Sequence, residues 1–166
     1  MINGFVDLTI AGWIHTILSS VGILVGAEQL LRTRRDRLHR WFGYVYVTAM
    51  VTADFAILTV YRFNGHFNAF HVGALANLLC IGMALQPMLA KPRPRQWKVK
   101  HYMWMSWSYV GLLSAALTEF IVRTQPLPGR GASLVATVLA TSFVCMAGAW
   151  VIRRHKPAPV PERATG

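Results

Sequence analysis

The chain has few acidic residues, few cysteines and none of the common catalytic motifs. Its 166 residues include only 6 Asp and Glu against 17 Lys and Arg, a formal net charge of +11. Cys80 and Cys145 form no CxxC pair and no Cys/His cluster, so we interpret them as buried apolar thiols. No Walker loop, GxSxG, HExxH or Rossmann glycine pattern occurs, which removes the common hydrolase and nucleotide-binding functions.

Charged residues are also scarce overall, at 14% against 54% hydrophobic. The apolar residues form long blocks, and about 20 of them in a row suffice to cross a bilayer as a helix. We therefore predict an all-α integral membrane protein with a bundle of about five transmembrane helices. Residues 1–156 would form a single transmembrane helical domain and 157–166 a disordered cytoplasmic tail. The predicted spans are Leu8–Leu31, Trp41–Tyr61, Phe67–Leu89, Tyr102–Val122 and Ser133–Ile152.

The cations are distributed unevenly between the two sides of this predicted bundle. Of the 17 Lys and Arg, 14 lie between spans one and two, between spans three and four, or after span five. Cationic loops stay on the cytoplasmic side. This predicts an outside N-terminus and a cytoplasmic C-terminus in a multi-pass protein of the bacterial inner (cytoplasmic) membrane. The cations would meet anionic lipid headgroups of the bilayer, and no recognition module suggests nucleic acid.

Histidines alternate between the two ends of successive spans. His15 and His71 fall toward the outer ends of spans one and three, whereas His39 and His101 begin spans two and four at the inner side. A pair of imidazoles from different helices can ligate a haem. The layout resembles, in pattern alone, ascorbate-dependent transmembrane b-type cytochromes. Haem b is therefore one candidate cofactor for the outer pair, and His39 with His101 could hold a second haem; the alternative for His39 and His101 is contact with headgroups or water.

Two intramembrane carboxylates offer a second chemistry. Asp54 and Glu119 are predicted at the depth of His15 and His71, and ionisable groups in hydrocarbon mark functional sites. Together the four could bind a divalent transition metal such as zinc, copper or iron, with His66 as a further ligand or cover. Asp54 or Glu119 would serve as catalytic base or handle a linked proton. The alternatives are a hydrogen-bond network without metal and, for Glu119, a structural ion pair with Arg123.

Four segments carry a resemblance to a known family: Gly12-Trp-Ile-His15, His39–Tyr46, Lys100–Tyr109 and Ala115–Arg123. In these segments the chain resembles the bacterial membrane proteins catalogued as domain of unknown function 2306. The resemblance implies an integral membrane protein of several helices and supplies no activity. It gives added weight, as functional positions, to His39, His101 and Glu119.

These observations predict a metal- or haem-binding membrane protein with a His/carboxylate site near the outer face. It would transfer electrons to or from a quinone or another small-molecule redox partner. It would then be a membrane oxidoreductase. Two alternatives stay open: a zinc-dependent membrane hydrolase at the outer site, and a carrier or assembly subunit without chemistry.

Overall fold

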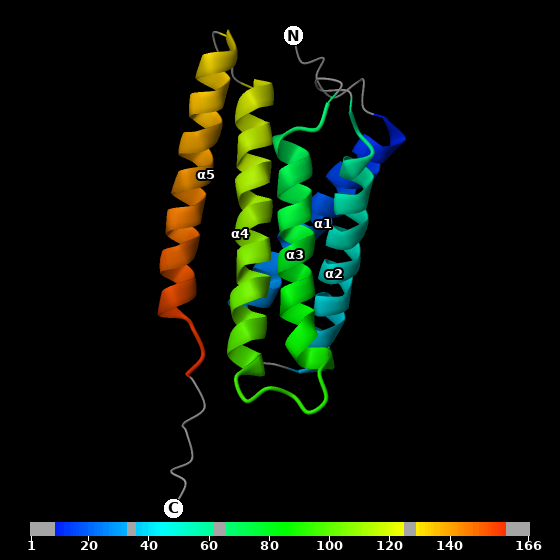
Figure 1. The fold of residues 1–166 in the computed structure, drawn as a ribbon, viewed down its shortest axis with the longest axis vertical. Coiled ribbons are helices and arrows are strands. Elements are labelled where there is room, and N and C mark those ends of the chain that lie inside the picture. The colour runs from blue at the N-terminus through cyan, green and yellow to red at the C-terminus, as the bar shows by residue number, and fades with distance from the viewer. Residues whose placement is uncertain (1–8, 33–35, 62–65, 125–128, 159–166) are drawn as a thin grey trace, which may run out of the picture.

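The protein folds as a bundle of long α-helices, and the computed structural model describes residues 9–32, 36–61, 66–124 and 129–158. No strand occurs in these ranges. Four helical segments are long and apolar enough to cross a membrane: α1, α2, α3 and Leu134–Arg154 of α5. The predicted all-α membrane architecture is thereby confirmed. The five helices (Figure 1) are α1 Ile10–Leu31, α2 Arg37–Leu58, α3 Ala69–Leu89, α4 Trp97–Thr124 and α5 Gly129–Arg154.

Among the five helices of the described residues, α4 alone contributes none of these apolar segments, and it lies between other helices. It contacts α1, α3 and α5, so much of its surface never meets lipid. Polar side chains are tolerated at membrane depth when they are buried in protein. The buried polar residues of α4 are accordingly hydroxyl-bearing: Ser106, Ser108, Ser114 and Thr118.

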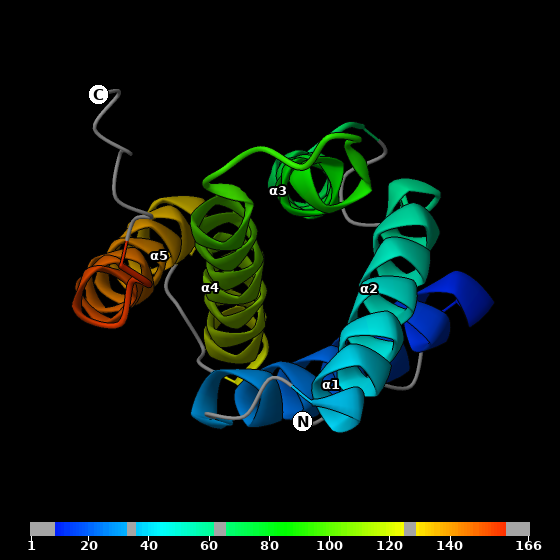
Figure 2. The ribbon, with the colours of Figure 1, turned by 90° about the horizontal axis from the view of Figure 1, so that it is seen from below.

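Helices α1 to α4 form a closed ring (Figure 2). Helix α1 packs against α2 and α4, and α3 packs against α2 and α4. Among the described residues, α5 packs against α4 alone, outside the ring. Consecutive helices run in opposite directions. As a result α1 and α3 are parallel and diagonally opposed across the ring, and so are α2 and α4.

Helix ends differ from the predicted spans because local capping groups set them. Helix α2 starts at Arg37, before the predicted Trp41, since the Asp36 carboxylate accepts the backbone N–H of His39 at 3.1 Å. Helix α3 starts after the predicted Phe67 because Asn68 caps it. Helix α4 extends beyond the predicted span at both ends. Leu8, the predicted start of the first span, and residues 159–166 of the predicted tail lie outside the described residues.

The centre of the ring is filled by side chains from α2, α3 and α4. Glycines on α1 let this helix approach them closely. A Cβ placed on Gly26 would collide with the ring of Tyr109 and lie 3.1 Å from the ring of Tyr46. The Tyr109 hydroxyl donates to the Ile23 carbonyl at 3.1 Å, so the ring cannot move freely. The central cluster consists of Tyr46, Met50, Ile81, Tyr109 and Leu112.

Replacing Gly26 by alanine should therefore destabilise the bundle. We expect the free energy of unfolding to fall by about 1–3 kcal/mol, the usual effect of overpacking a dense core. Titration with a denaturing detergent, followed by circular dichroism, would measure the change. Gly73→Ala is the control, because a Cβ there meets nothing within 4 Å; equal losses in both variants would contradict the close approach.

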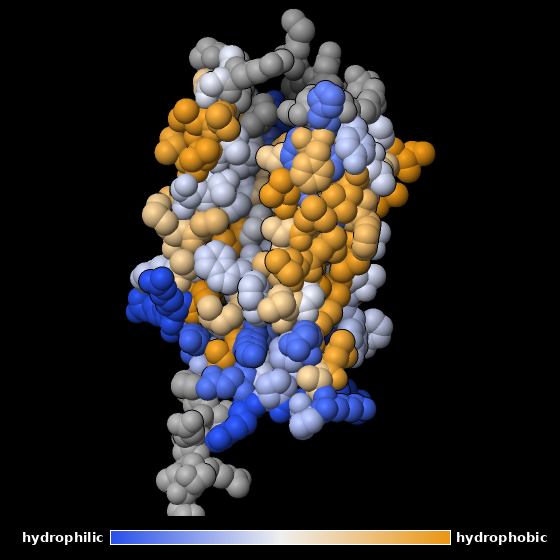
Figure 3. All heavy atoms as spheres, viewed as in Figure 1, coloured by the Kyte–Doolittle hydropathy of each residue, from blue (hydrophilic) through white to orange (hydrophobic). Residues whose placement is uncertain are grey.

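One end of the bundle is strongly basic, and we call it the basic end. It is where α2 and α4 begin and α5 ends, and Figure 3 shows hydrophilic residues gathered there below a more apolar surface. Arg32 bridges Glu28 at 3.3 Å and Asp36 at 3.0 Å, and this guanidinium lowers the pKa of Asp36. The exposed cations of this end include Arg37, Arg40, Lys98, Lys100, Arg153 and Arg154.

Candidate functional site

Each helix of the ring carries one histidine within its first two turns. His39 in α2 and His101 in α4 lie at the basic end, and we call them the basic-end tier. His15 in α1 and His71 in α3 form the far-end tier. Because α2 is diagonal to α4 and α1 is diagonal to α3, each tier takes its two histidines from parallel helices on opposite sides of the ring.

Backbone carbonyls fix the proton position on two of these rings. His101 Nδ1 lies 3.1 Å from the carbonyl oxygen of Ala84, and His15 Nδ1 lies 3.0 Å from that of Ala53. A carbonyl only accepts, so Nδ1 carries the hydrogen in both rings. In the neutral imidazole the lone pair is then on Nε2, and metal-ligating histidines commonly have this arrangement.

His39 is held in place through its backbone. Its N–H donates to the Asp36 carboxylate, and its carbonyl oxygen accepts from Gln29 Nε2 of α1 at 2.6 Å. The side chain is half-buried. The start of α2 is therefore anchored to α1 at the level of this histidine.

His71 has the opposite arrangement. Its Nδ1 accepts the backbone N–H of Asn68 at 3.2 Å, which completes the cap of α3. The hydrogen of the neutral ring is therefore on Nε2, which is buried and has no hydrogen-bond partner in the described part of the chain. The ring is 1% exposed and packs against Tyr61 and Phe67 at centroid distances of 4.8 and 5.0 Å. Ligation through Nε2 would require the cap to break.

Asp54 ends a buried chain of hydrogen bonds that joins three helices. Tyr46 of α2 lies 3.0 Å from the Ser108 hydroxyl of α4, which donates to Asn77 Oδ1 of α3 at 2.5 Å. Asn77 Nδ2 donates to Asp54 Oδ2 at 2.7 Å. Since Ser108 uses its proton on Asn77, Tyr46 is the donor to Ser108. All four side chains are at most 8% exposed, and Asp54 is the final acceptor.

The remaining candidates do not join these groups. Glu119 pairs with Arg123 one turn along α4, with N–O distances of 2.7 and 2.9 Å, as the ion-pair alternative predicted. His66 is exposed before α3. Within the described ranges, no three His, Cys, Asp or Glu residues are grouped so as to bind a metal ion. The arrangement thus brings Asp54 to Asn77 and Glu119 to Arg123, without a shared centre that includes His15 and His71.

Comparison with known proteins places the chain in a family. The family model described as Predicted membrane protein (DUF2306) matches residues 12–155. The chain belongs to this family. The DUF2306 match includes all four histidines of the two tiers and the whole Tyr46–Asp54 hydrogen-bond chain. No curated protein and no solved structure matches the sequence.

Sequence reasoning missed Asn77, Tyr46 and Ser108 in this DUF2306 protein. Asn77 had the clearest signal, since a carboxamide in the middle of an apolar span needs a partner just as a carboxylate does. Tyr46 and Ser108 gave a weaker signal in the sequence, because hydroxyl groups are common in membrane helices and do not by themselves indicate a site. Their importance follows from α2, α3 and α4 meeting at one level, which only the fold establishes.

Proposed function

We propose that the protein is a membrane electron-transfer protein that binds haem b at the basic-end tier, with His39 and His101 as axial ligands. The observation that carries this proposal is the origin of the tier in parallel, diagonally opposed helices. Their helices face each other across a four-helix ring. Cofactor sites in bundles are built from side chains on facing helices, and a haem with two histidine ligands needs one imidazole from each side.

The chemistry of the donors supports a haem at this tier. The Ala84 carbonyl keeps the hydrogen of His101 on Nδ1, so that Nε2 carries the lone pair of the neutral ring, as in many metal-ligating histidines. The backbone of His39 is fixed by Asp36 and Gln29. Exposed Arg40, next to His39, offers a cation for a haem propionate. A haem with two histidine ligands supplies one-electron transfer.

The far-end tier supports a second haem less well. His15 has a free Nε2 lone pair, but the Asn68 cap places a hydrogen on Nε2 of His71. We therefore assign the electron site to the basic end and propose Asp54, buried near the far end of α2, as the group that takes up a linked proton. The proposed partner is a quinone or another small one-electron carrier.

A zinc hydrolase at the far end, the second prediction from sequence, has less support. It requires three protein ligands and an open position. The described residues offer no such group of His, Cys, Asp and Glu. A single pair of histidines at the basic end agrees better with haem than with a hydrolytic metal.

The test is the visible spectrum of protein purified in detergent after expression with ample haem, together with elemental analysis for iron, copper and zinc. We expect a Soret band, a sharp α-band on reduction and about one iron per chain, as for a low-spin b-type centre. Zinc or copper without haem would contradict the proposal. Colourless, metal-free protein would also contradict it and favour a carrier or assembly subunit.

A further inference from the structure

An apolar groove runs along the outer side of α4, between α3 and α5. It has a volume of about 530 Å³, within the range of about 300–1,000 Å³ typical of small-molecule sites. Helix α3 contributes Cys80, α5 contributes Cys145, and α4 forms the floor. The groove exists because α5 packs against α4 alone, which leaves α3 and α5 apart.

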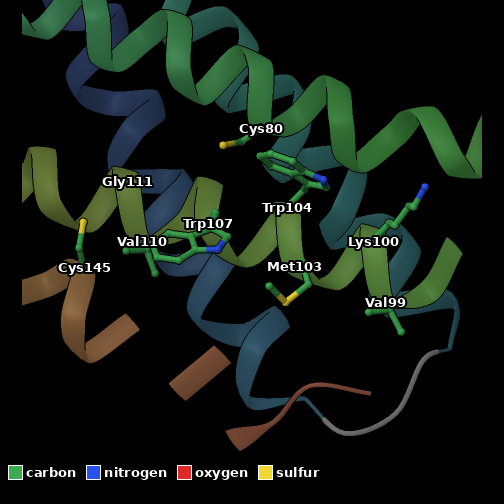
Figure 4. Close-up of a pocket in the computed structure, with 9 residues that line it drawn as sticks. All are labelled: Cys80, Val99, Lys100, Met103, Trp104, Trp107, Val110, Gly111 and Cys145. Carbon is green, nitrogen blue, oxygen red and sulfur yellow. The ribbon is translucent and has the colours of Figure 1, made fainter. Parts of the chain in front are cut away.

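The lining of the groove changes along its length. Figure 4 shows Lys100 toward one end, Cys145 and Gly111 toward the other, and Trp104 and Trp107 between them. Lys100 is exposed at the basic end of the bundle. It is the one charged side chain among the lining residues.

The dimensions suit one lipid chain. From Lys100 to Gly111 the helix that forms the floor is about 17 Å long, at a rise of 1.5 Å per residue. One leaflet of a bilayer has a hydrocarbon depth of about 15 Å. A chain in the groove would therefore reach from the middle of the membrane to the surface, where the Lys100 ammonium lies.

We propose that this groove binds one anionic phospholipid, with an acyl chain along Trp104 and Trp107 and its phosphate at Lys100. The apolar lining recognises the chain, and Lys100, the one cation among the lining residues, recognises the negative headgroup. Basic pockets between membrane helices bind anionic headgroups by the same attraction. The site is separate from the histidine tiers and does not depend on bound haem.

Two matched pairs of variants test the two halves of the site. Gly111→Leu fills the groove, and a Cβ at Gly111 meets nothing within 4 Å, so the variant should fold. Its control is Gly82→Leu on α3, which has the same open surroundings but does not line the groove. Lys100→Gln removes the cation, and its control is Lys98→Gln, whose ammonium lies over the Trp97 ring at 5.8 Å.

Native mass spectrometry of delipidated protein would follow the binding of phosphatidylglycerol, of phosphatidylcholine with the same chains, and of glycerol phosphate. We expect wild-type protein to bind one phosphatidylglycerol preferentially. Gly111→Leu should weaken this binding by at least about tenfold, which corresponds to 1.4 kcal/mol. Lys100→Gln should weaken it by about fivefold, the effect of one cation near an anionic lipid. Both controls should bind as wild type does.

Other outcomes would overturn the assignment. Equal binding of the two phospholipids would indicate ordinary surrounding lipid. Binding of glycerol phosphate as tight as that of the whole lipid would mean that the groove plays no part. A lipid-free dimer that Gly111→Leu dissociates would identify a second copy as the occupant.

Discussion

Replacing His101 by alanine is expected to abolish haem binding in protein that still folds. Loss of a group that merely orients a metal ligand costs about 10–100-fold in affinity, so loss of an axial ligand should reduce retained haem below detection. The Soret absorbance and the iron content would both report this. His39→Ala should behave in the same way, because the proposed site needs both rings.

His155→Ala is the matched control for this experiment. His155 is exposed after α5, and its Nδ1 lies 3.0 Å from the Val151 carbonyl of its own helix. Its replacement should leave the spectrum unchanged. Added imidazole should restore the band in His101→Ala, an effect that a purely structural histidine would not show. A full band in His101→Ala would refute the basic-end site, and loss confined to His15→Ala and His71→Ala would move the haem to the far end.

Replacing Asn77 by leucine is expected to cause the largest loss of stability. The substitution keeps the number of side-chain heavy atoms but removes both hydrogen bonds of the carboxamide, to Ser108 and to Asp54. Each buried polar group left without a partner costs about 1–3 kcal/mol, and more if it is charged. Asn77→Leu should therefore lower the free energy of unfolding several times as much as a substitution at an exposed position does.

A second variant separates hydrogen bonding from packing. Replacing both partners of a buried hydrogen bond by apolar groups can be nearly neutral. Asp54→Leu combined with Asn77→Leu should therefore recover part of the stability that Asn77→Leu loses. Unfolding by denaturing detergent, monitored by circular dichroism, gives both values. The loss of unfolding free energy in the double variant could equal the sum of the losses in Asp54→Leu and Asn77→Leu alone. Asp54 and Asn77 would then not be coupled, which would contradict their 2.7 Å contact.

Much of the fold could be predicted because apolar blocks of membrane length are a direct physical signal. The helix ends could not, since Asp36 and Asn68 cap α2 and α3 through contacts that hydropathy ignores. Helix α4 is another case: its hydroxyl and aromatic residues lower its hydropathy, and only its central position explains why they are tolerated.

The candidate site was predictable in its positions but not in its chemistry. The alternation of histidines along the chain placed one at the start of each ring helix. The ring tautomers depend on Ala53, Ala84 and the cap at Asn68, which no spacing reveals. Carboxylates of similar predicted depth have different partners: Asp54 bonds a buried amide across helices, while Glu119 bonds a cation on its own helix.

The closed ring also determines the order in which the chain can fold during synthesis. Its last contact joins α4 to α1, and the bond from Tyr109 to Ile23 spans 86 residues. The bond that closes the ring therefore cannot form until the ribosome has made α4 at least as far as Tyr109, and until then α1 lacks its contact with α4. Helix α5 adds to an assembly that is already closed, so its late arrival leaves the contacts of the four ring helices intact.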